Sequence, residues 1–361
     1  MYLKTLHLRN FRNYASLKIG FSERFNIICA DNGAGKTNLL EAINLLSTGK
    51  SFRTLNLKEL IQHKKSYFCI EAEIVSQNIS QIIKIYYDGK TKKITYNSNT
   101  YPSFTSLLGV MPSILQSPDD INLIKGKPQV RRKFLNLHLA QADPLYVHHY
   151  LRFTKTLRQR NHLLKTNKAH LLKPFDTLLC KSGAYLSWRR KAFLQELQTP
   201  LNDALKNLSK IIINPKLHYL SSTSVEKDLD KTHDIYLQNL QKNQKKDLDF
   251  KTTLIGPHRD DFAINIDSKT AKNFASEGQK KMLLYAMRFA EWSLLFSKYE
   301  QKPLFLVDDL DAHLDENHLN NLKSAFNNFS QVFITMPKAN EHFKNEHFEN
   351  AYFINLNKKT Y

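Results

Sequence analysis

FNIICADNGAGKT, at residues 25–37, joins a run of buried-type residues to a glycine-bearing turn, and a helical pattern then continues to about Leu46. Phe25–Cys29 has the length and composition of a buried strand. Gly33 and Gly35 let the turn curl so that several backbone N–H groups converge, which is the arrangement that holds a phosphate. The start of the helix adds the positive end of its dipole. The pattern therefore predicts a strand, a phosphate-binding loop and a helix in succession.

The side chains of this loop indicate a nucleotide site. Lys36 would bridge the β- and γ-phosphates, and the Thr37 hydroxyl would hold Mg²⁺. The common pattern begins with glycine, where this chain has Ala30. The alternative interpretation is a glycine-rich turn that binds nothing. The residues predicted to contact nucleotide are Ala30, Asp31, Asn32, Gly33, Ala34, Gly35, Lys36 and Thr37.

A second pattern, LFLVDD, places Asp308 and Asp309 directly after an apolar strand at residues 304–307. Carboxylates at the end of a buried strand are costly unless they have a function. Beside a phosphate-binding loop, the first acid supports the Mg²⁺ shell and the second polarises the attacking water. Without the loop, the pair could equally be two surface aspartates.

A third pattern, SEGQ at residues 276–279, opens a predicted helix over about 277–296. A serine before a glycine at a helix start either binds an anion or simply caps the helix. Because the chain already has one phosphate-binding loop, a second anion site suggests that two copies of the chain meet across nucleotide.

The charge balance points to an anionic partner. The chain has 361 residues, with 53 Lys and Arg against 33 Asp and Glu, which leaves a net charge of +20. Nucleic acid is the leading candidate for the partner, and an acidic membrane surface is the second. Three widely spaced cysteines and the lack of a long apolar run lead us to expect a cytoplasmic protein without a membrane segment.

Most of the surplus charge lies in one region. Residues 121–200 contain 16 Lys and Arg and only 3 Asp and Glu. A solvated basic face is the ordinary explanation, but the scarcity of acids favours contact with DNA phosphates. No base-reading motif is visible, so we expect recognition of the DNA backbone or of a junction. The predicted DNA contacts are Arg152, Arg158, Arg160, Arg189 and Arg190.

The order of patterns predicts an α/β fold whose head is divided by an insertion. Strand patterns at about 67–75, 82–87, 93–96, 252–255 and 262–266 accompany the buried strands at 304–307 and 332–335. Residues 131–208 are helical in pattern. We therefore expect an N-terminal head part at 1–120, a basic helical insertion at 121–249, and a C-terminal head part at 250–361.

The three patterns, in this order, resemble the ATP-binding-cassette head of SMC-type chromosome and repair ATPases, a P-loop fold. Further stretches are similar to the RecF recombination-repair family. These stretches are LRNFR at 8–12, NGAGKTNLLEA at 32–42, SFRT at 51–54, PDD at 118–120 and GPHRDD at 256–261. The last predicted strand ends in Thr335-Met336, without the histidine that many cassette ATPases have there, which fits slow hydrolysis.

The resemblance implies specific roles. Lys36 and Asp309 would be catalytic, the latter as general base, while Thr37 and Asp308 would hold Mg²⁺. Asn38 would line the phosphate loop, and Ala312-His313-Leu314-Asp315 would cross a dimer interface. The residues that would contact the γ-phosphate held by the other protomer are Ser276, Gly278 and Gln279.

For two further positions the sequence leaves alternatives open. Gln116 is either a lid glutamine that reaches Mg²⁺ or a polar loop residue. Asn10 and Arg12 either touch nucleotide or form a salt bridge on an edge strand.

At the level of function, the resemblance implies a DNA replication and repair ATPase that dimerises with ATP and binds double-stranded or gapped DNA. It also implies weak, DNA-stimulated hydrolysis as the release step, and recombinase loading with RecO- and RecR-like partners. Two alternatives remain: the ATPase subunit of a membrane transporter, and a non-catalytic DNA scaffold that merely holds ATP.

Overall fold

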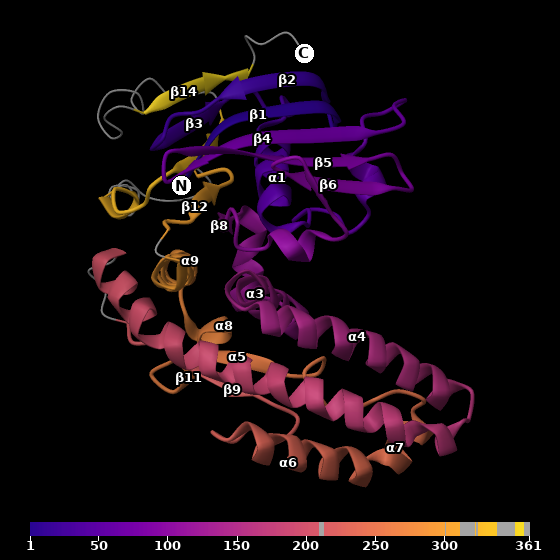
Figure 1. The fold of residues 1–361 in the computed structure, drawn as a ribbon. Helices are drawn as coiled ribbons and strands as arrows, with labels where there is room; N and C mark the ends of the chain where they lie inside the picture. Colours follow the sequence, from indigo (N-terminus) through magenta and orange to yellow (C-terminus); the bar gives the residue numbers. More distant parts are fainter. Residues whose placement is uncertain (209–212, 300, 311–321, 323, 338–350, 357–361) are drawn as a thin grey trace. The chain divides into compact units, whose positions relative to one another are not determined.

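The computed structural model describes residues 1–208, 213–299, 301–310, 322, 324–337 and 351–356. The chain divides into two compact units (Figure 1). Unit 1 contains residues 1–120, 204–212 and 285–361, and unit 2 contains residues 121–203 and 213–284. Residues 250–284 therefore belong to the unit that holds the helical region, whereas the sequence pattern assigned them to the C-terminal head part.

Unit 1 contains a six-stranded antiparallel sheet with the order β2-β1-β4-β5-β6-β7. Its strands are β1 (Tyr2–Phe11), β2 (Tyr14–Gly20), β4 (Phe68–Ser76), β5 (Ile79–Tyr87), β6 (Lys92–Tyr96) and β7 (Asn99–Tyr101). Buried and exposed residues alternate along β1, as expected for a sheet with one covered face. The turn at Asp88-Gly89 joins β5 to β6, and Gly89 has a φ of 87°.

The second sheet of unit 1 is parallel and has the order β14-β3-β13-β12-β8. Its strands are β3 (Phe25–Cys29), β8 (Ser113–Gln116), β12 (Leu304–Val307), β13 (Val332–Met336) and β14 (Tyr352–Asn355). Every residue of β3, β12 and β13 is buried, which confirms the prediction of buried strands.

One helix, α1 (Lys36–Thr48), joins the two sheets of unit 1 (Figure 1). It contacts β4 and β5 of the antiparallel sheet and β8 and β13 of the parallel sheet. Leu40 of α1, Ile70 of β4 and Leu306 of β12 belong to a single buried core. Because this core surrounds α1, it fixes the place of the loop that precedes the helix. Three short 3₁₀ turns, η1 (Leu57–Leu60), η2 (Phe104–Leu107) and η3 (Pro118–Ile121), lie after α1 in the chain.

Unit 2 is mainly helical. Its helices are α2 (Asn122–Lys125), α3 (Pro128–Ala142), α4 (Pro144–Lys165), η4 (Ala169–Leu171), most of α5 (Leu172–Leu208), α6 (Leu229–Lys242), α7 (Gln244–Asp249), α8 (Ala271–Phe274) and the start of α9 (Glu277–Tyr299). The small antiparallel sheet has the order β11-β10-β9, from Lys269–Thr270, Asp261–Ile266 and Lys216–Leu220. His149 of α4 stacks on Tyr185 of α5, with 4.3 Å between the ring centroids.

The predicted strand at residues 252–255 is wrong, because this segment has no strand partner. Its polar groups are satisfied by side chains instead. Thr253 donates from its backbone N and from its Oγ1 to Asn161 Oδ1, at 2.9 and 2.7 Å, and Leu254 N donates to Asp247 Oδ1 at 3.0 Å. Side-chain oxygens thus take the place of a neighbouring strand for Thr253 and Leu254.

Candidate nucleotide site and basic surface

The loop between β3 and α1 has the shape of a phosphate nest. Gly33 and Gly35 have φ angles of 84° and 106°, which residues with side chains rarely adopt. A Cβ on Gly35 would lie 2.7 Å from the hydroxyl of Tyr14, which donates to Gly35 O at 2.9 Å. The first turn of α1 has no side-chain cap, so its backbone N–H groups are available to an anion.

Lys36 and Thr37 follow the nest at the start of α1. The ammonium of Lys36 donates to the carbonyl oxygens of Ala30 and Asp31, at 2.7 and 3.1 Å, so its side chain lies back over the loop. The hydroxyl of Thr37 donates to Asp308 Oδ1 at 3.0 Å. The structure thus brings together two predicted Mg²⁺ ligands that are 271 residues apart in the chain.

Asp308 lies directly after β12 and is only 8% exposed. Burial raises the pKa of its carboxyl group, while hydrogen bonds from Thr335 and Thr37 act in the opposite direction. Thr335 Oγ1 donates to Asp308 Oδ1 at 2.7 Å and accepts from the backbone N of Asp309 at 2.9 Å. Thr335 was not among the predicted site residues. The only signal for it was its place at the end of a buried strand.

Asp309 differs from Asp308 in exposure and in backbone conformation. Its side chain is exposed, and its backbone is in the left-handed region with a φ of 57°. The contact between Asp309 N and Thr335, together with that between Leu310 N and Thr335 O at 3.1 Å, holds this conformation. Such a strained residue beside a buried carboxylate is typical of a functional site.

Gln116 lies at the end of β8, next to β12. Its backbone oxygen accepts from Asp308 N at 2.8 Å, and its side chain is buried. Gln116 Nε2 donates to Ser117 O at 3.2 Å, whereas Oε1 is buried and has no hydrogen-bond partner within the described part of the chain. An orphaned acceptor on the strand next to Asp308 fits a cation that prefers oxygen ligands.

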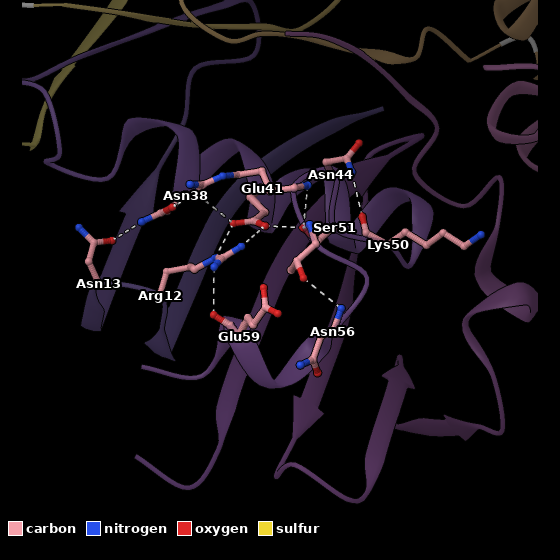
Figure 2. A network of polar contacts seen from close by, with 11 residues as sticks. Arg12, Asn13, Asn38, Glu41, Asn44, Lys50, Ser51, Asn56 and Glu59 are labelled. Carbon is pink, nitrogen blue, oxygen red and sulfur yellow. Dashed lines mark hydrogen bonds and ion pairs between the residues drawn. The ribbon is translucent and has the colours of Figure 1, made fainter. Parts of the chain in front are cut away.

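A buried carboxylate organises the arginines beside the nest (Figure 2). Glu41 of α1 is fully buried and accepts from Arg12 Nε and Nη2 at 2.8 and 2.7 Å. Ser51 Oγ donates to the same carboxylate, and Arg53 Nη1 lies 3.7 Å from it. The predicted alternative of a salt bridge for Arg12 is therefore observed, with its partner on α1.

An open pocket of about 570 Å³ adjoins this network. Its lining residues are Arg12, Asn13, Asn38, Arg53, Glu59, Ile61, Gln62 and His63. Asn13 Nδ2 donates to Ala34 O of the nest at 3.2 Å, and Asn38 Nδ2 donates to Asn13 Oδ1 at 2.8 Å. The pocket and the phosphate nest therefore share a wall that includes Asn13.

The predicted second anion site lies at the start of α9. Ser276 Oγ accepts from Gln279 N at 3.2 Å, and Gln279 Oε1 accepts from Ser276 N at 2.8 Å, which is a capping box. Ser276 and Gly278 are exposed, and a Cβ on Gly278 would meet no atom within 4 Å. The helix start is thus capped by its own side chains, and the space next to Gly278 is open. Residues 312–315, predicted to cross a dimer interface, lie outside the described residues.

The five arginines predicted to contact DNA have different environments. Arg158 is exposed and Arg152 is half-buried. Arg189 is half-buried and donates to Glu196 Oε1 and Oε2 at 3.0 and 3.2 Å. The predictions for Arg160 and Arg190 are wrong, because both side chains are buried.

Each buried arginine has internal partners. Arg160 Nε donates to Asp176 Oδ1 at 2.7 Å, and its Nη1 donates to Asp247 Oδ2 and to Thr253 Oγ1, also at 2.7 Å. Arg190 Nη1 donates to Pro257 O at 2.6 Å. A charged side chain that is enclosed and paired in this way cannot reach a DNA phosphate.

No helix of the described residues is both long and apolar enough to cross a membrane. None of these residues forms a cluster of three or more His, Cys, Asp or Glu side chains that could hold a metal ion.

Comparison with known proteins gives consistent similarities. The sequence model of the family described as "RecF/RecN/SMC N terminal domain" matches residues 2–359. The chain is 37% identical to "DNA replication and repair protein RecF" of Protochlamydia amoebophila (strain UWE25), over 95% of this chain and 96% of the relative.

Two solved structures are similar over nearly the whole chain. "Structure of the recombination mediator protein RecF-ATPrS in RecFOR pathway" aligns with a TM-score of 0.89 and 31% identity, over 98% of this chain and 96% of that one. "Structure of the recombination mediator protein RecF-ATP in RecFOR pathway" aligns with a TM-score of 0.88 and 32% identity, over 94% and 93% of the two chains. These similarities do not favour the transporter alternative.

Proposed function

This chain belongs to the RecF branch of the RecF/RecN/SMC N-terminal domain family, and we propose that it is an ATP-dependent DNA-binding protein of DNA replication and repair. The observation that carries the proposal is the meeting of Thr37 and Asp308 beside a glycine-dependent phosphate nest. Relatives named for DNA replication and repair, and a related structure named for its complex with ATP, support the same function.

ATP would bind with its phosphates in the nest at residues 30–37. Lys36 would leave the carbonyls of Ala30 and Asp31 to donate to the phosphates, since an ammonium gains more from an anion than from neutral carbonyls. The sugar and base would enter the adjoining pocket, whose wall includes Arg12 and Asn38. The bidentate contact with Glu41 holds Arg12 in place for this role.

Thr37, Asp308 and Gln116 Oε1 are the groups that would hold Mg²⁺ with the nucleotide. When bound, the ion would neutralise charge on the phosphates. Asp309 would take a proton from the attacking water, because its carboxylate is exposed and its backbone is held just past the strand. A nearby general base typically contributes about 10²- to 10⁴-fold to the rate. Hydrolysis would be weak and stimulated by DNA.

A second copy of the chain would complete the site. Ser276, Gly278 and Gln279 present an open, capped helix start that is exposed to solvent. They would contact the γ-phosphate held by the other protomer, so that ATP links two chains and hydrolysis separates them. The dimer would bind double-stranded or gapped DNA and act with RecO- and RecR-like proteins in loading recombinase.

Lys36→Ala tests the nucleotide site, and Lys18→Ala, which removes an exposed charge from β2, is the matched control. Calorimetry should show that Lys36→Ala loses ATP binding while the control binds like the parent. DNA binding should then be measured with and without ATP on gapped, double-stranded and single-stranded substrates. ATP binding by Lys36→Ala at the parental affinity would contradict the assignment of the phosphate nest. DNA binding by the parent that does not respond to ATP would contradict the proposed ATP dependence of DNA binding.

ATP hydrolysis, measured with and without DNA, separates the proposed ATPase from a scaffold that merely holds ATP. We expect slow release of phosphate that DNA accelerates. Binding of ATP without any turnover, in the presence of DNA and Mg²⁺, would favour the scaffold.

A further inference from the structure

Asp260 is the centre of an unusually dense polar network in unit 2. Its carboxylate is buried and accepts five hydrogen bonds. The donors are Ser187 Oγ of α5 at 2.7 Å, Tyr219 OH of β9 at 2.7 Å, Ser221 Oγ at 3.2 Å, and Ser222 N and Oγ at 2.9 and 3.0 Å. A buried carboxylate with this many donors is held in one position.

Three arginines hold the backbone and the acid on either side of Asp260. Arg190 of α5 donates to Pro257 O at 2.6 Å, and Arg132 of α3 donates to Asp260 O at 2.8 Å. Arg131 of α3 makes a bidentate pair with Asp261, with both contacts at 2.7 Å. Each of these guanidinium groups is thus engaged within the protein.

The beginning of the same segment is also fixed. Gly256 has a φ of 120°, and its backbone N donates to Ser222 Oγ at 2.7 Å. A Cβ at this position would lie 2.1 Å from the hydroxyl of Tyr236, so only glycine is accommodated. Residues 256–261 therefore form a rigid loop, although residues 256–260 belong to no strand.

The segment contains one exposed cation, Arg259. Its backbone N donates to Gly256 O at 2.8 Å, which closes a tight turn. Its guanidinium has no hydrogen bond or ion pair with any residue that the structure describes, in contrast to Arg131, Arg132 and Arg190. Burial of so many polar groups costs free energy. The buried network around Asp260 holds Arg259 at a fixed place on the surface.

The electrostatic surroundings of Arg259 are positive. Burial and then Arg190 lower the pKa of the Arg132 guanidinium; Asp261 and Asp260 raise it, and Arg259 is close enough to lower it as well. Of the neighbouring acids, Asp260 is buried and Asp261 is paired with Arg131. Lys127 and Lys133, at the start of α3, are exposed. The guanidinium groups of Arg132 and Arg190 donate to backbone carbonyls, so their charges are not cancelled by a direct ion pair, and an exposed arginine beside them fits an anionic partner.

We infer that Arg259 contacts a phosphate of the DNA backbone, held for that contact by Asp260, Arg132 and Arg190. The inference rests on the proposed DNA-binding function and names a residue that carries it. DNA is favoured over a free nucleotide because the loop offers one guanidinium and not a nest of N–H groups. It is favoured over an acidic protein because the similar protein is named for DNA replication and repair, the function on which the inference rests. The contact would not depend on base sequence.

The test is the salt dependence of binding to double-stranded DNA, measured by fluorescence anisotropy from about 50 to 200 mM salt. Each phosphate contact contributes about 0.9 to the slope of log K against log salt. Arg259→Ala should reduce the magnitude of the slope by about that amount and weaken binding to unrelated sequences equally. Arg259→Lys, which retains the charge, should keep most of the slope. Calorimetric affinity for ATP should be unchanged in both variants.

Lys242→Ala is the matched control, because it removes one exposed charge from the same unit at the end of α6. If Arg259→Ala keeps the parental slope, or changes it no more than Lys242→Ala does, the inference is wrong. If the parent binds DNA and Arg259→Ala loses only a protein partner, the inference is also wrong. Failure of the parent to bind any DNA would overturn the proposed function together with the inference.

A double-mutant cycle tests the supporting role of Asp260. Asp260→Asn should weaken DNA binding only through Arg259, so the double variant should bind DNA no worse than Arg259→Ala alone. Circular dichroism at the assay temperature establishes that each variant is folded. Additive losses of affinity would show that Asp260 does not act by positioning Arg259.

Discussion

Replacement of Arg160 by leucine tests whether this arginine is an internal support or a DNA contact. Its side chain is 0% exposed, and its guanidinium is paired with Asp176 and Asp247, each at 2.7 Å. Leucine would leave both carboxylates without their cation. Removal of one partner from a buried ion pair typically costs about 3–5 kcal/mol of the free energy of unfolding. Arg158→Leu, at an exposed position on the same helix, should change it by less than about 0.5 kcal/mol.

The loss in free energy of unfolding caused by Arg160→Leu should depend on pH. In the parent, burial raises the pKa of Asp176, and the contact with Arg160 counteracts this rise. Without Arg160, the pKa of Asp176 in the folded state should therefore rise further. A carboxyl group whose pKa is raised by folding contributes stability at low pH and loses it as the pH increases through that pKa. The deficit of Arg160→Leu relative to the parent should thus grow as the pH rises from the folded-state pKa of Asp176 in the parent to its higher value in the variant.

Urea unfolding followed by tryptophan fluorescence measures this effect. The chain has 2 tryptophans, and Trp188 belongs to unit 2 while Trp292 belongs to unit 1. A Trp292→Phe background therefore leaves one reporter, whose indole donates to Lys227 O at 2.9 Å, in the unit under test. Parental stability of Arg160→Leu, combined with a smaller salt slope for DNA binding, would refute the assignment of Arg160 to the interior.

Three further substitutions test the nucleotide site. Gly35→Ala places a Cβ 2.7 Å from Tyr14 OH at a φ of 106°. If the resulting strain in the loop exceeds about 1.4 kcal/mol, calorimetry should show ATP affinity reduced by about tenfold or more. Parental affinity would mean that the nest tolerates a side chain. Ser276→Arg should leave ATP binding by the monomer intact and block the ATP-dependent dimer in sedimentation experiments, and a normal dimer would count against a shared site. Asp309→Asn should lower turnover by about 10²- to 10⁴-fold with little change in ATP affinity; turnover at the parental rate would remove Asp309 from catalysis.

Local patterns in the sequence predicted the parts of the site that are continuous in the chain. The loop at residues 30–35 needs two positive φ angles, which glycine provides, and its strand and helix are set by neighbouring residues. The turn between β5 and β6 is local in the same way, since Gly89 supplies its φ of 87°. The cap formed by Ser276 and Gln279 is also local, because its partners are three residues apart.

Contacts between distant segments could not be read from these patterns. Thr37, Asp308 and Thr335 meet because β3, β13 and β12 are neighbours in the parallel sheet, an order that differs from their order in the chain. Thr335 was therefore overlooked, although it donates to the carboxylate that the sequence did identify. The same sheet places Gln116 beside Asp308, and contact of its side chain with Mg²⁺ stays a prediction.

The sequence alone determined that this chain has a phosphate-binding loop and a strongly basic middle region, since both are properties of consecutive residues and of composition. Only the tertiary structure decided which basic residues reach solvent. Arg158 and Arg160 are two residues apart on one helix, yet one is exposed and the other is enclosed by acids 16 and 87 residues away. Positive charge indicates an anion, but burial selects between an internal carboxylate and an external phosphate, because desolvation makes an unpaired buried charge too costly to keep.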